Sequence, residues 1–224
     1  RDVERSRGLG DVYKRQGQEA YIPNFFCKAY RPVLYIPSKE EVKELLQKMD
    51  IRTSHNSEQF RLDRECKILF LLYFCCGLRL SEGRLLKWEH IDLDKGIFTV
   101  LGSKGNKDRL VYLPQDSLPV LKNYKERQEM LFPGIDWAFP GKDPHKPVSC
   151  SGVESSFNRH WAMLPVARTV DKHPTPHCLR HAFVVERFNE WMHQGIDTNT
   201  MLPYLSRYLG HKSPDETYYY CLLY

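Results

Sequence analysis

Apolar residues recur at helical spacing along much of the chain. The first such stretch follows Ser38 and contains Val42, Leu45, Leu46 and Met49. The pattern predicts a helix with Ser38 at its N-cap and acidic residues in its first turn. A longer helix is predicted from about residue 60 to residue 76, after a polar loop. Its apolar residues cover every side, so we expect it in the centre of the core, ending at Gly77.

The chain turns sharply after Gly77. Ser81 is predicted to cap a short new helix that carries Leu85, Leu86 and Trp88. Arg79 then lies at the junction of two helices, where a side chain can be held rigidly and still face a cleft. Taken alone, the same position also suits a surface arginine near a helix end.

Two runs rich in β-formers follow, at residues 97–101 and 110–113. The segment between them is rich in glycine and basic residues, which predicts an antiparallel hairpin with a basic tip. A lysine on such a tip can reach a phosphate or a leaving oxygen, although exposed hairpin tips commonly collect Gly, Asn and Lys.

The rest of the chain is predicted to be mainly helical. Residues 131–148 hold four prolines and are predicted to be irregular. Further helices are expected at 117–130, 152–163, 178–192, 200–209 and, as a short last helix, 214–220. The predicted fold class is therefore α+β, mainly α, with one small antiparallel sheet.

The composition of the chain excludes few classes of protein function. The 224 residues are 42% hydrophobic and 27% charged, as in ordinary globular proteins, and the formal net charge is +5. That charge is compatible with nucleic acid but does not argue for it strongly. The longest apolar run, Ile68 to Cys76, is about half of the ~20 residues that a membrane span needs. The seven cysteines form no Cys-x-x-Cys pair, so we expect reduced thiols and no zinc site.

The chemically most informative stretch lies near the C-terminus. His177, Arg180 and His181 stand close together, His211 follows a Leu-Gly pair, and Tyr220 comes nine residues after His211. Imidazoles, a guanidinium and a phenol are groups that can bind a phosphodiester and attack it without a metal. His177 and His181 also have the i,i+4 spacing of a zinc pair, but no third ligand is evident.

Taken in order, five motifs resemble the catalytic domain of the tyrosine recombinases, the phage integrase family. They are Gly-Leu-Arg-x-Ser-Glu, the basic hairpin, His-x-x-Arg-His, Leu-Gly-His and Thr-x-x-Tyr. The resemblance covers roughly residues 37–220. It implies the helical catalytic fold of the DNA breaking-rejoining type, with no cofactor and no metal.

The resemblance assigns roles to nine residues. Its catalytic residues fall on Arg79, Lys104, His177, Arg180, His211 and Tyr220. Glu82, Lys107 and His181 match supporting or DNA-contacting positions, and Glu82 could hold Arg79 or cap its helix. Tyr220 is the expected nucleophile on spacing alone, because Tyr218 and Tyr219 are its direct neighbours.

These residue types fit the chemistry that the family performs. Two guanidiniums can clamp the non-bridging oxygens of a phosphodiester in a bidentate way, and His211 can add a donor. His177 is expected to act as the base for the Tyr220 phenol, and Lys104 to protonate the leaving 5′-oxygen. The product would be a covalent 3′-phosphotyrosine, which a second DNA 5′-hydroxyl then resolves.

The predicted domain organisation follows from these assignments. We expect non-native tails at residues 1–16 and 221–224, an extended lead-in at 17–37 and the catalytic domain at 38–220. Without residues 1–16 the net charge falls to +3. The family's N-terminal DNA clamp and the segment after its nucleophile are missing from this pattern. We therefore expect a truncated catalytic domain that recombines poorly or not at all.

The resemblance also implies partners and a setting. Double-stranded DNA is the expected substrate, and the full-length protein is expected to form a homo-oligomer, a tetramer, on it. The setting would be the cytoplasm of a prokaryotic cell, with a gene of a phage or mobile element. Two alternatives stay open: a non-catalytic DNA-binding module, and a type IB topoisomerase-like enzyme that nicks and reseals one strand.

Overall fold

The computed structural model describes residues 35–52, 55–103, 107–211 and 216–217. The α-helices in these ranges are α2 (Lys39–Lys48), α3 (Ser57–Cys76), α4 (Leu80–Arg84), α5 (Leu118–Leu131), α6 (Cys150–Trp161), α7 (His177–His193) and α8 (Thr198–Leu209). The strands are β1 (Ile91–Asp92), β2 (Ile97–Ser103) and β3 (Lys107–Tyr112). Short 3₁₀ turns are Trp88–His90, Gln115–Ser117 and Pro165–Arg168.

The first two helices form as the sequence predicts. The Ser38 hydroxyl accepts from the Glu41 N–H, and the Glu41 carboxylate accepts from the Ser38 N–H, which closes a capping box on α2. Helix α3 begins at Ser57, three residues earlier than expected, because the Asn56 side chain caps it by accepting from two backbone N–H groups.

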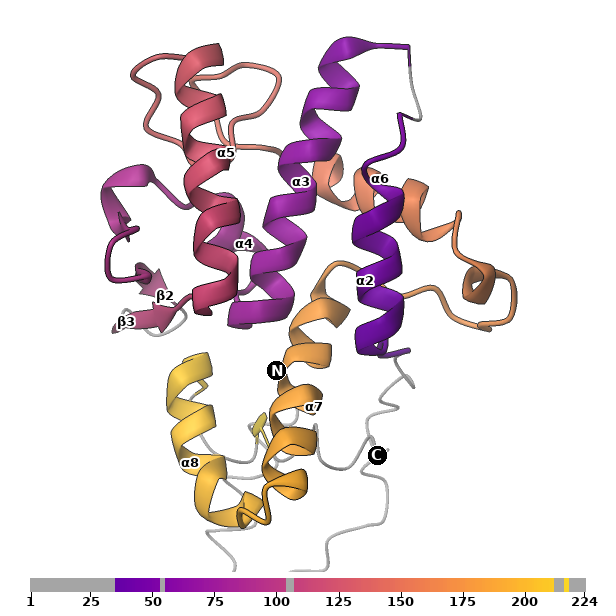
Figure 1. Cartoon of the computed structure of the whole chain (residues 1–224), viewed down its shortest axis with the longest axis vertical. Coiled ribbons are helices and arrows are strands. Elements are labelled where there is room, and N and C mark those ends of the chain that lie inside the picture. The colour runs from indigo at the N-terminus through magenta and orange to yellow at the C-terminus, as the bar shows by residue number, and fades with distance from the viewer. Residues whose placement is uncertain (1–34, 53–54, 104–106, 212–215, 218–224) are drawn as a thin grey trace, which may run out of the picture. The chain divides into compact units, whose positions relative to one another are not determined.

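Helix α3 is the central element, as its all-round apolar pattern predicts. It packs against α2, α4, α6 and α7 (Figure 1). Leu69, Phe70 and Leu72 on α3 are at most 1% exposed. These side chains are buried on different sides of the same helix. Helix α3 therefore forms the centre of the core, against which elements that are far apart in sequence pack.

Gly77 ends α3 in the left-handed conformation, with a φ of 62°. Glycine is required there for two reasons. An added Cβ would be strained at this φ, and it would lie 2.5 Å from the ring of Phe183 on α7. Gly77 thus turns the chain toward α4 and also lets α7 approach closely.

The start of α4 differs from the prediction. Arg79, not Ser81, is the N-cap, and the Glu82 carboxylate accepts from the Arg79 N–H at 2.7 Å. That bond starts the helix at Leu80, so the exposed Ser81 lies inside the first turn. The helix also ends earlier than expected, with Leu85 as its C-cap, and Trp88 belongs to a 3₁₀ turn.

The predicted hairpin is present and extended by β1 into a three-stranded antiparallel sheet, in the order β1-β2-β3. Val100 pairs with Arg109, and Phe98 pairs with Val111. Phe98, Val100 and Val111 are at most 3% exposed. Since paired residues of an antiparallel sheet point to the same face, Arg109 lies on the core side of the sheet.

Two hydrophobic clusters organise the described residues. The larger contains α2, α3, the sheet and α6, with Phe157 and Trp161 among its fully buried members. The smaller joins α7 to α8 through Phe183, Phe188 and Leu205. Leu179 on α7 belongs to the larger cluster and Phe183 to the smaller, so Arg180 lies between the two clusters.

The remaining helices match the prediction to within two residues, and residues 132–149 are irregular as expected. Of the predicted last helix, 214–220, only Glu216 and Thr217 lie within the described residues, and both are helical. None of the helices in the described ranges has the length and apolar character that crossing a bilayer requires.

Candidate active site

The fold brings together four of the six predicted catalytic residues. Arg79, His177, Arg180 and His211 come from the α3–α4 junction, the start of α7 and the residue pair after α8. The charges of Arg79 and Arg180 both act on His177 and on His211. Lys104 and Tyr220 lie outside the described residues. Lys107 is the first residue of β3, where its backbone pairs with Ser103.

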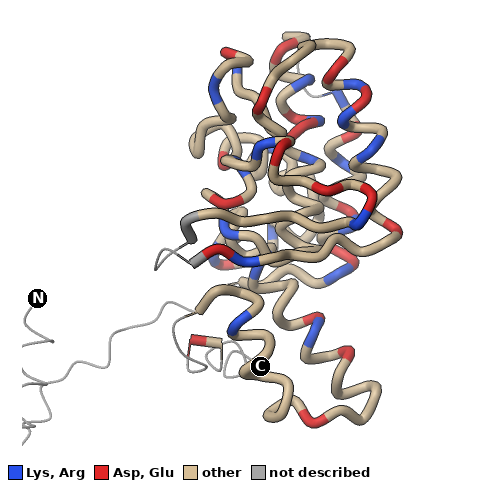
Figure 2. The backbone as a smooth tube through the Cα atoms, turned by 90° about the vertical axis from the view of Figure 1, so that its left-hand side faces the viewer, with Lys and Arg blue, Asp and Glu red and all other residues tan. Residues whose placement is uncertain are grey.

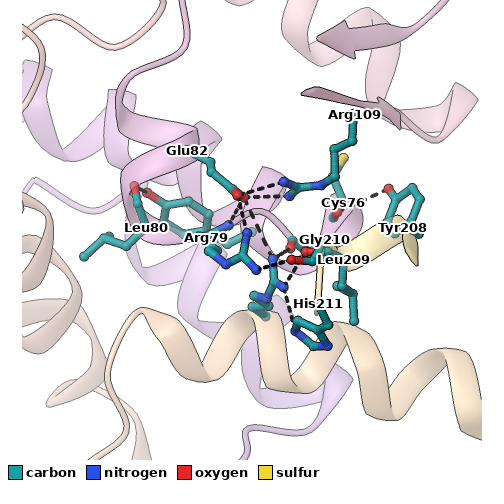
Figure 3. A network of polar contacts seen from close by, with 12 residues as sticks. Cys76, Arg79, Leu80, Glu82, Arg109, Tyr208, Leu209, Gly210 and His211 are labelled. Atoms are coloured by element: carbon teal, nitrogen blue, oxygen red, sulfur yellow. Dashed lines mark hydrogen bonds and ion pairs between the residues drawn. The ribbon is translucent and has the colours of Figure 1, made fainter. Parts of the chain in front are cut away.

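Arg79 is held by backbone and side chain at once. As N-cap of α4 it donates its N–H to Glu82, and its Nη1 donates to Glu82 Oε1 at 2.7 Å. Its Nη2 donates to the carbonyl oxygen of Gly210 at 2.8 Å, directly before His211 (Figure 3). The first arginine is therefore tied to the Leu-Gly-His motif, 131 positions further along the chain.

Glu82 is the centre of the network. Its side chain is only 6% exposed, and each oxygen accepts from both Arg79 and Arg109. Burial opposes ionisation of this carboxyl, but hydrogen bonds from Arg109 and Arg79 outweigh that effect and lower the pKa of Glu82 to about 2. Glu82 both holds Arg79 and caps its helix, the two roles that the sequence offered as alternatives.

Arg109 is a member of the site that the sequence interpretation missed. Its Nη1 and Nη2 donate to the two oxygens of Glu82 at 2.8 and 2.7 Å, and its side chain is 9% exposed. A signal for it existed in the sequence. In β3, Arg109 alternates in step with the apolar Val111 and Leu113, so a cation falls on the core face of the strand.

Arg180 is the most deeply buried cation of the site, at 1% exposure. Its Nη1 donates to the carbonyl oxygen of Gly77 at 2.6 Å, and its Nη2 donates to that of Leu209 at 2.9 Å. Two carbonyls at the ends of α3 and α8 thus fix the plane of the guanidinium. Glu82 Oε2 lies 3.9 Å from its Nη1 and adds a longer-range attraction.

His211 is held from both ring nitrogens. Its Nε2 lies 3.0 Å from Arg180 Nη2, and its Nδ1 lies 2.7 Å from the hydroxyl of Thr217. A guanidinium can only donate, so Nε2 accepts, and we assign the proton of the neutral ring to Nδ1, which donates to Thr217. Burial, and then the charges of Arg180, Arg79 and Arg109, lower the pKa of His211 to about 4.

The two histidines of α7 differ in exposure. His177, at the first position of the helix, is exposed to solvent, whereas His181 is only 5% exposed. Their rings meet edge-on with centroids 4.8 Å apart. Loss of water around the ring, and then the charges of Arg180 and Arg79, lower the pKa of His177. Burial, and then His177 and Arg180, lower the pKa of His181 to about 3.

The arrangement favours an anion. Three guanidiniums face one carboxylate, so positive charge exceeds negative charge locally, and the neutral His177 can accept a proton near pH 7. Figure 2 shows Lys and Arg interspersed with Asp and Glu along the described backbone. Among the residues that the structure describes, the site is therefore the feature that points to phosphate chemistry. Within the described ranges, no three His, Cys, Asp or Glu side chains form a group that could hold a metal ion.

The sequence from residue 38 to residue 223 matches the model of the phage integrase family. The chain belongs to this family. It is 32% identical over 185 residues to the tyrosine recombinase XerA of Pyrococcus furiosus, covering 82% of this chain and 55% of XerA. It is also 32% identical over 171 residues to XerC of Alcanivorax borkumensis, covering 75% of this chain and 53% of XerC.

The fold is that of solved tyrosine recombinases. A crystal structure of the XerH site-specific recombinase, bound to a palindromic difH substrate in a post-cleavage complex, superposes with a TM-score of 0.63 at 23% identity. That match covers 95% of this chain and 58% of XerH. The expected fold class is thus confirmed. The chain spans 46–63% of the length of the first curated relatives it matches.

Proposed function

We propose that this chain is the catalytic domain of a tyrosine recombinase, which cleaves and rejoins DNA through a covalent 3′-phosphotyrosine. The observation that supports it best is the convergence of Arg79, Arg180 and His211, three phosphate-binding groups from distant segments, around a single carboxylate. Each of them occupies the position that the family motif assigns to a catalytic residue.

In the proposed reaction, Arg79 and Arg180 bind the non-bridging oxygens of the scissile phosphate. The Tyr220 phenol transfers its proton to His177 and attacks phosphorus, so a bond from Tyr220 Oη to phosphorus forms. The bond from phosphorus to the 5′-oxygen breaks, and Lys104 gives that oxygen a proton. The lowered pKa of His177 supports its role as the base, because the ring is neutral near pH 7.

Rejoining reverses these steps with a new DNA end. A 5′-hydroxyl attacks the phosphotyrosine, and Tyr220 leaves as the phenol. The bond energy is conserved in the intermediate, so the exchange needs no added energy source. His211 accepts from Arg180 in the free site, so contact with a phosphate oxygen requires its ring to gain a proton or to exchange that partner.

The partners and the setting are part of the proposal. Double-stranded DNA is the substrate, since XerH in its solved complex is bound to difH DNA. We also propose a homo-oligomer, a tetramer on DNA, for the full-length protein, and the cytoplasm of a prokaryotic cell as its compartment. Residues 38–220 would form the catalytic domain, and His181 and Lys107 would support it or contact DNA.

Covalent trapping tests the proposal. The protein is incubated with a pool of random-core nicked duplexes from which the cleaved fragment diffuses away, and adducts are sought on a denaturing gel. We expect an adduct that Tyr220→Phe abolishes. Tyr218→Phe and Tyr219→Phe serve as matched controls, and both should still form it. DNA binding without any adduct would contradict the proposal and favour a binding module.

A further inference from the structure

The Glu82 carboxylate is shared evenly between two arginines. Oε1 accepts from Arg79 Nη1 and Arg109 Nη1, and Oε2 accepts from the Arg79 N–H and Arg109 Nη2, all between 2.7 and 2.8 Å. Arg109 alone makes the two-pronged contact, in which both terminal nitrogens meet both oxygens (Figure 3). Arg79 places only one terminal nitrogen on the carboxylate and the other on Gly210.

This sharing has a consequence for Arg79. A two-pronged pair is the strongest contact that a guanidinium makes with a carboxylate. If Arg109 did not occupy Glu82 in this way, the carboxylate could form the same pair with Arg79. The Arg79 guanidinium would then turn away from Gly210, and its charge would be neutralised where a phosphate has to bind.

We propose that Arg109 is a positioning residue, which occupies Glu82 by its two-pronged ion pair and so keeps the Arg79 guanidinium available to the scissile phosphate. This inference rests on the proposed function. It also explains why a cation lies on the core face of β3, opposite Val100. The pair joins the strand that follows the hairpin tip directly to the first helix of the site.

The burial of the pair supports a role within the protein and not on DNA. Glu82 and Arg109 are 6% and 9% exposed, against 19% for Arg79. Both terminal nitrogens of Arg109 already point at Glu82, and its Nε is buried with no hydrogen-bond partner among the described residues. A group in this position reaches substrate only through its neighbours.

The test compares Arg109→Lys, Glu82→Gln and the double variant in the full chain. Lysine keeps the charge but lacks the paired N–H donors of the guanidinium.

We expect Arg109→Lys to slow adduct formation on the nicked duplex pool by roughly 10- to 100-fold per folded protein, because a misplaced catalytic group lowers the rate by such factors. The double variant should be no slower than the slower single variant, because Arg109 acts through Glu82. Full-rate cleavage by Arg109→Lys, or effects that multiply in the double variant, would overturn the inference.

Two further readouts separate positioning from other roles. The salt dependence of duplex binding should be unchanged in Arg109→Lys and in Arg109→Gln. Loss of a phosphate contact would instead lower the slope of the logarithm of the binding constant against the logarithm of the salt concentration by about 1. Arg61→Lys is the matched control for a merely structural role. It alters another buried Arg–Glu pair in the same way, with Glu65 on α3, and should leave cleavage per folded protein unchanged.

A chemical readout does not depend on cleavage. Phenylglyoxal modifies accessible guanidiniums, and peptide mapping by mass spectrometry reports the rate at Arg79. Capture of Arg79 by Glu82 should make this rate several-fold slower in Arg109→Lys than in the wild type, and an unchanged rate would contradict the inference. If the wild-type chain forms no adduct, the proposed function fails, while the Arg79 rate still decides the role of Arg109.

Discussion

The hydroxyl of Thr217 lies 2.7 Å from Nδ1 of His211. Thr217 is fully buried, and it lies three residues before Tyr220 in the sequence. Because Arg180 occupies the other ring nitrogen of His211, this contact fixes the rotation of the imidazole. It also connects the segment that leads to the proposed nucleophile with the arginines that would bind the phosphate.

Thr217→Val should therefore lower the rate of adduct formation more than it lowers the stability of the fold. The substitution keeps the shape but removes the acceptor of the Nδ1–H, which costs about 1–3 kcal/mol when the donor is buried. We expect adduct formation to slow by roughly 10-fold, in line with a loss of about 1.4 kcal/mol in positioning. Thr217→Ser retains the hydroxyl and should stay near the wild-type rate. Equal losses in both variants would show that packing of the methyl group matters, and not the hydrogen bond.

Glu82→Gln should destabilise the protein strongly. It removes the only carboxylate that meets Arg79, Arg109 and Arg180 within the described residues, and breaking a buried ion pair on one side costs about 3–5 kcal/mol. Urea denaturation followed by circular dichroism measures the loss. The control is Glu89→Gln, whose side chain is 63% exposed and pairs with Lys87. A surface pair of this kind contributes about 0–1 kcal/mol, so equal losses in the two variants would contradict the central role of Glu82.

Gly77→Ala should be costly because of both conformation and space. A φ of 62° disfavours any Cβ by roughly 1–2 kcal/mol, and the new methyl would meet the Phe183 ring at 2.5 Å, which adds about 1–3 kcal/mol of overpacking. Gly195→Ala is a matched control. It has a φ of 68° but nothing within 4 Å of the added Cβ, so it should show the conformational cost alone. Equal losses of unfolding free energy would mean that α7 moves aside without cost.

The sequence predicts the local structure well where local forces decide it. The N-cap of α2 at Ser38, the end of α3 at Gly77 and the hairpin depend on residues that are near one another in the sequence, and all three are as expected. The start of α4 is different, although the contact that sets it is also local. The Glu82 carboxylate accepts from the Arg79 N–H three positions earlier, whereas the prediction followed the general preference for serine at an N-cap.

The same distinction applies to the candidate site. Family motifs place Arg79, Arg180 and His211, and the structure brings these three together. The motifs do not show that Arg109 and Thr217 complete their hydrogen bonds. Arg109 is 27 positions from its partner Glu82, so only the alternation of β3 could have pointed to it. Lys104 and Tyr220 stay predictions, since they lie outside the described residues.

The histidines of the site should make the free protein sensitive to acid. The pKa of buried His181 is lowered to about 3 by loss of water and by the neighbouring His177, Arg180 and His211, whereas an unfolded histidine titrates near ~6.5. Below that value His181 is protonated in the unfolded chain but stays neutral in the folded protein. The free energy of unfolding is therefore highest above about pH 6.5 and falls as the pH drops toward 3.

Linkage gives the size of the effect and its control. Between pH 7 and pH 5, His181 alone should lower the free energy of unfolding by roughly 2 kcal/mol, and His211 should act in the same direction. Urea denaturation at a series of pH values measures the slope of the free energy of unfolding against pH. His181→Gln removes the titrating group and should flatten the slope between pH 7 and pH 5. His193→Gln, at the exposed end of α7, is the control for the substitution itself. A slope that is the same in His181→Gln and in the wild type would show that His181 takes up its proton in the folded protein as easily as in the unfolded chain.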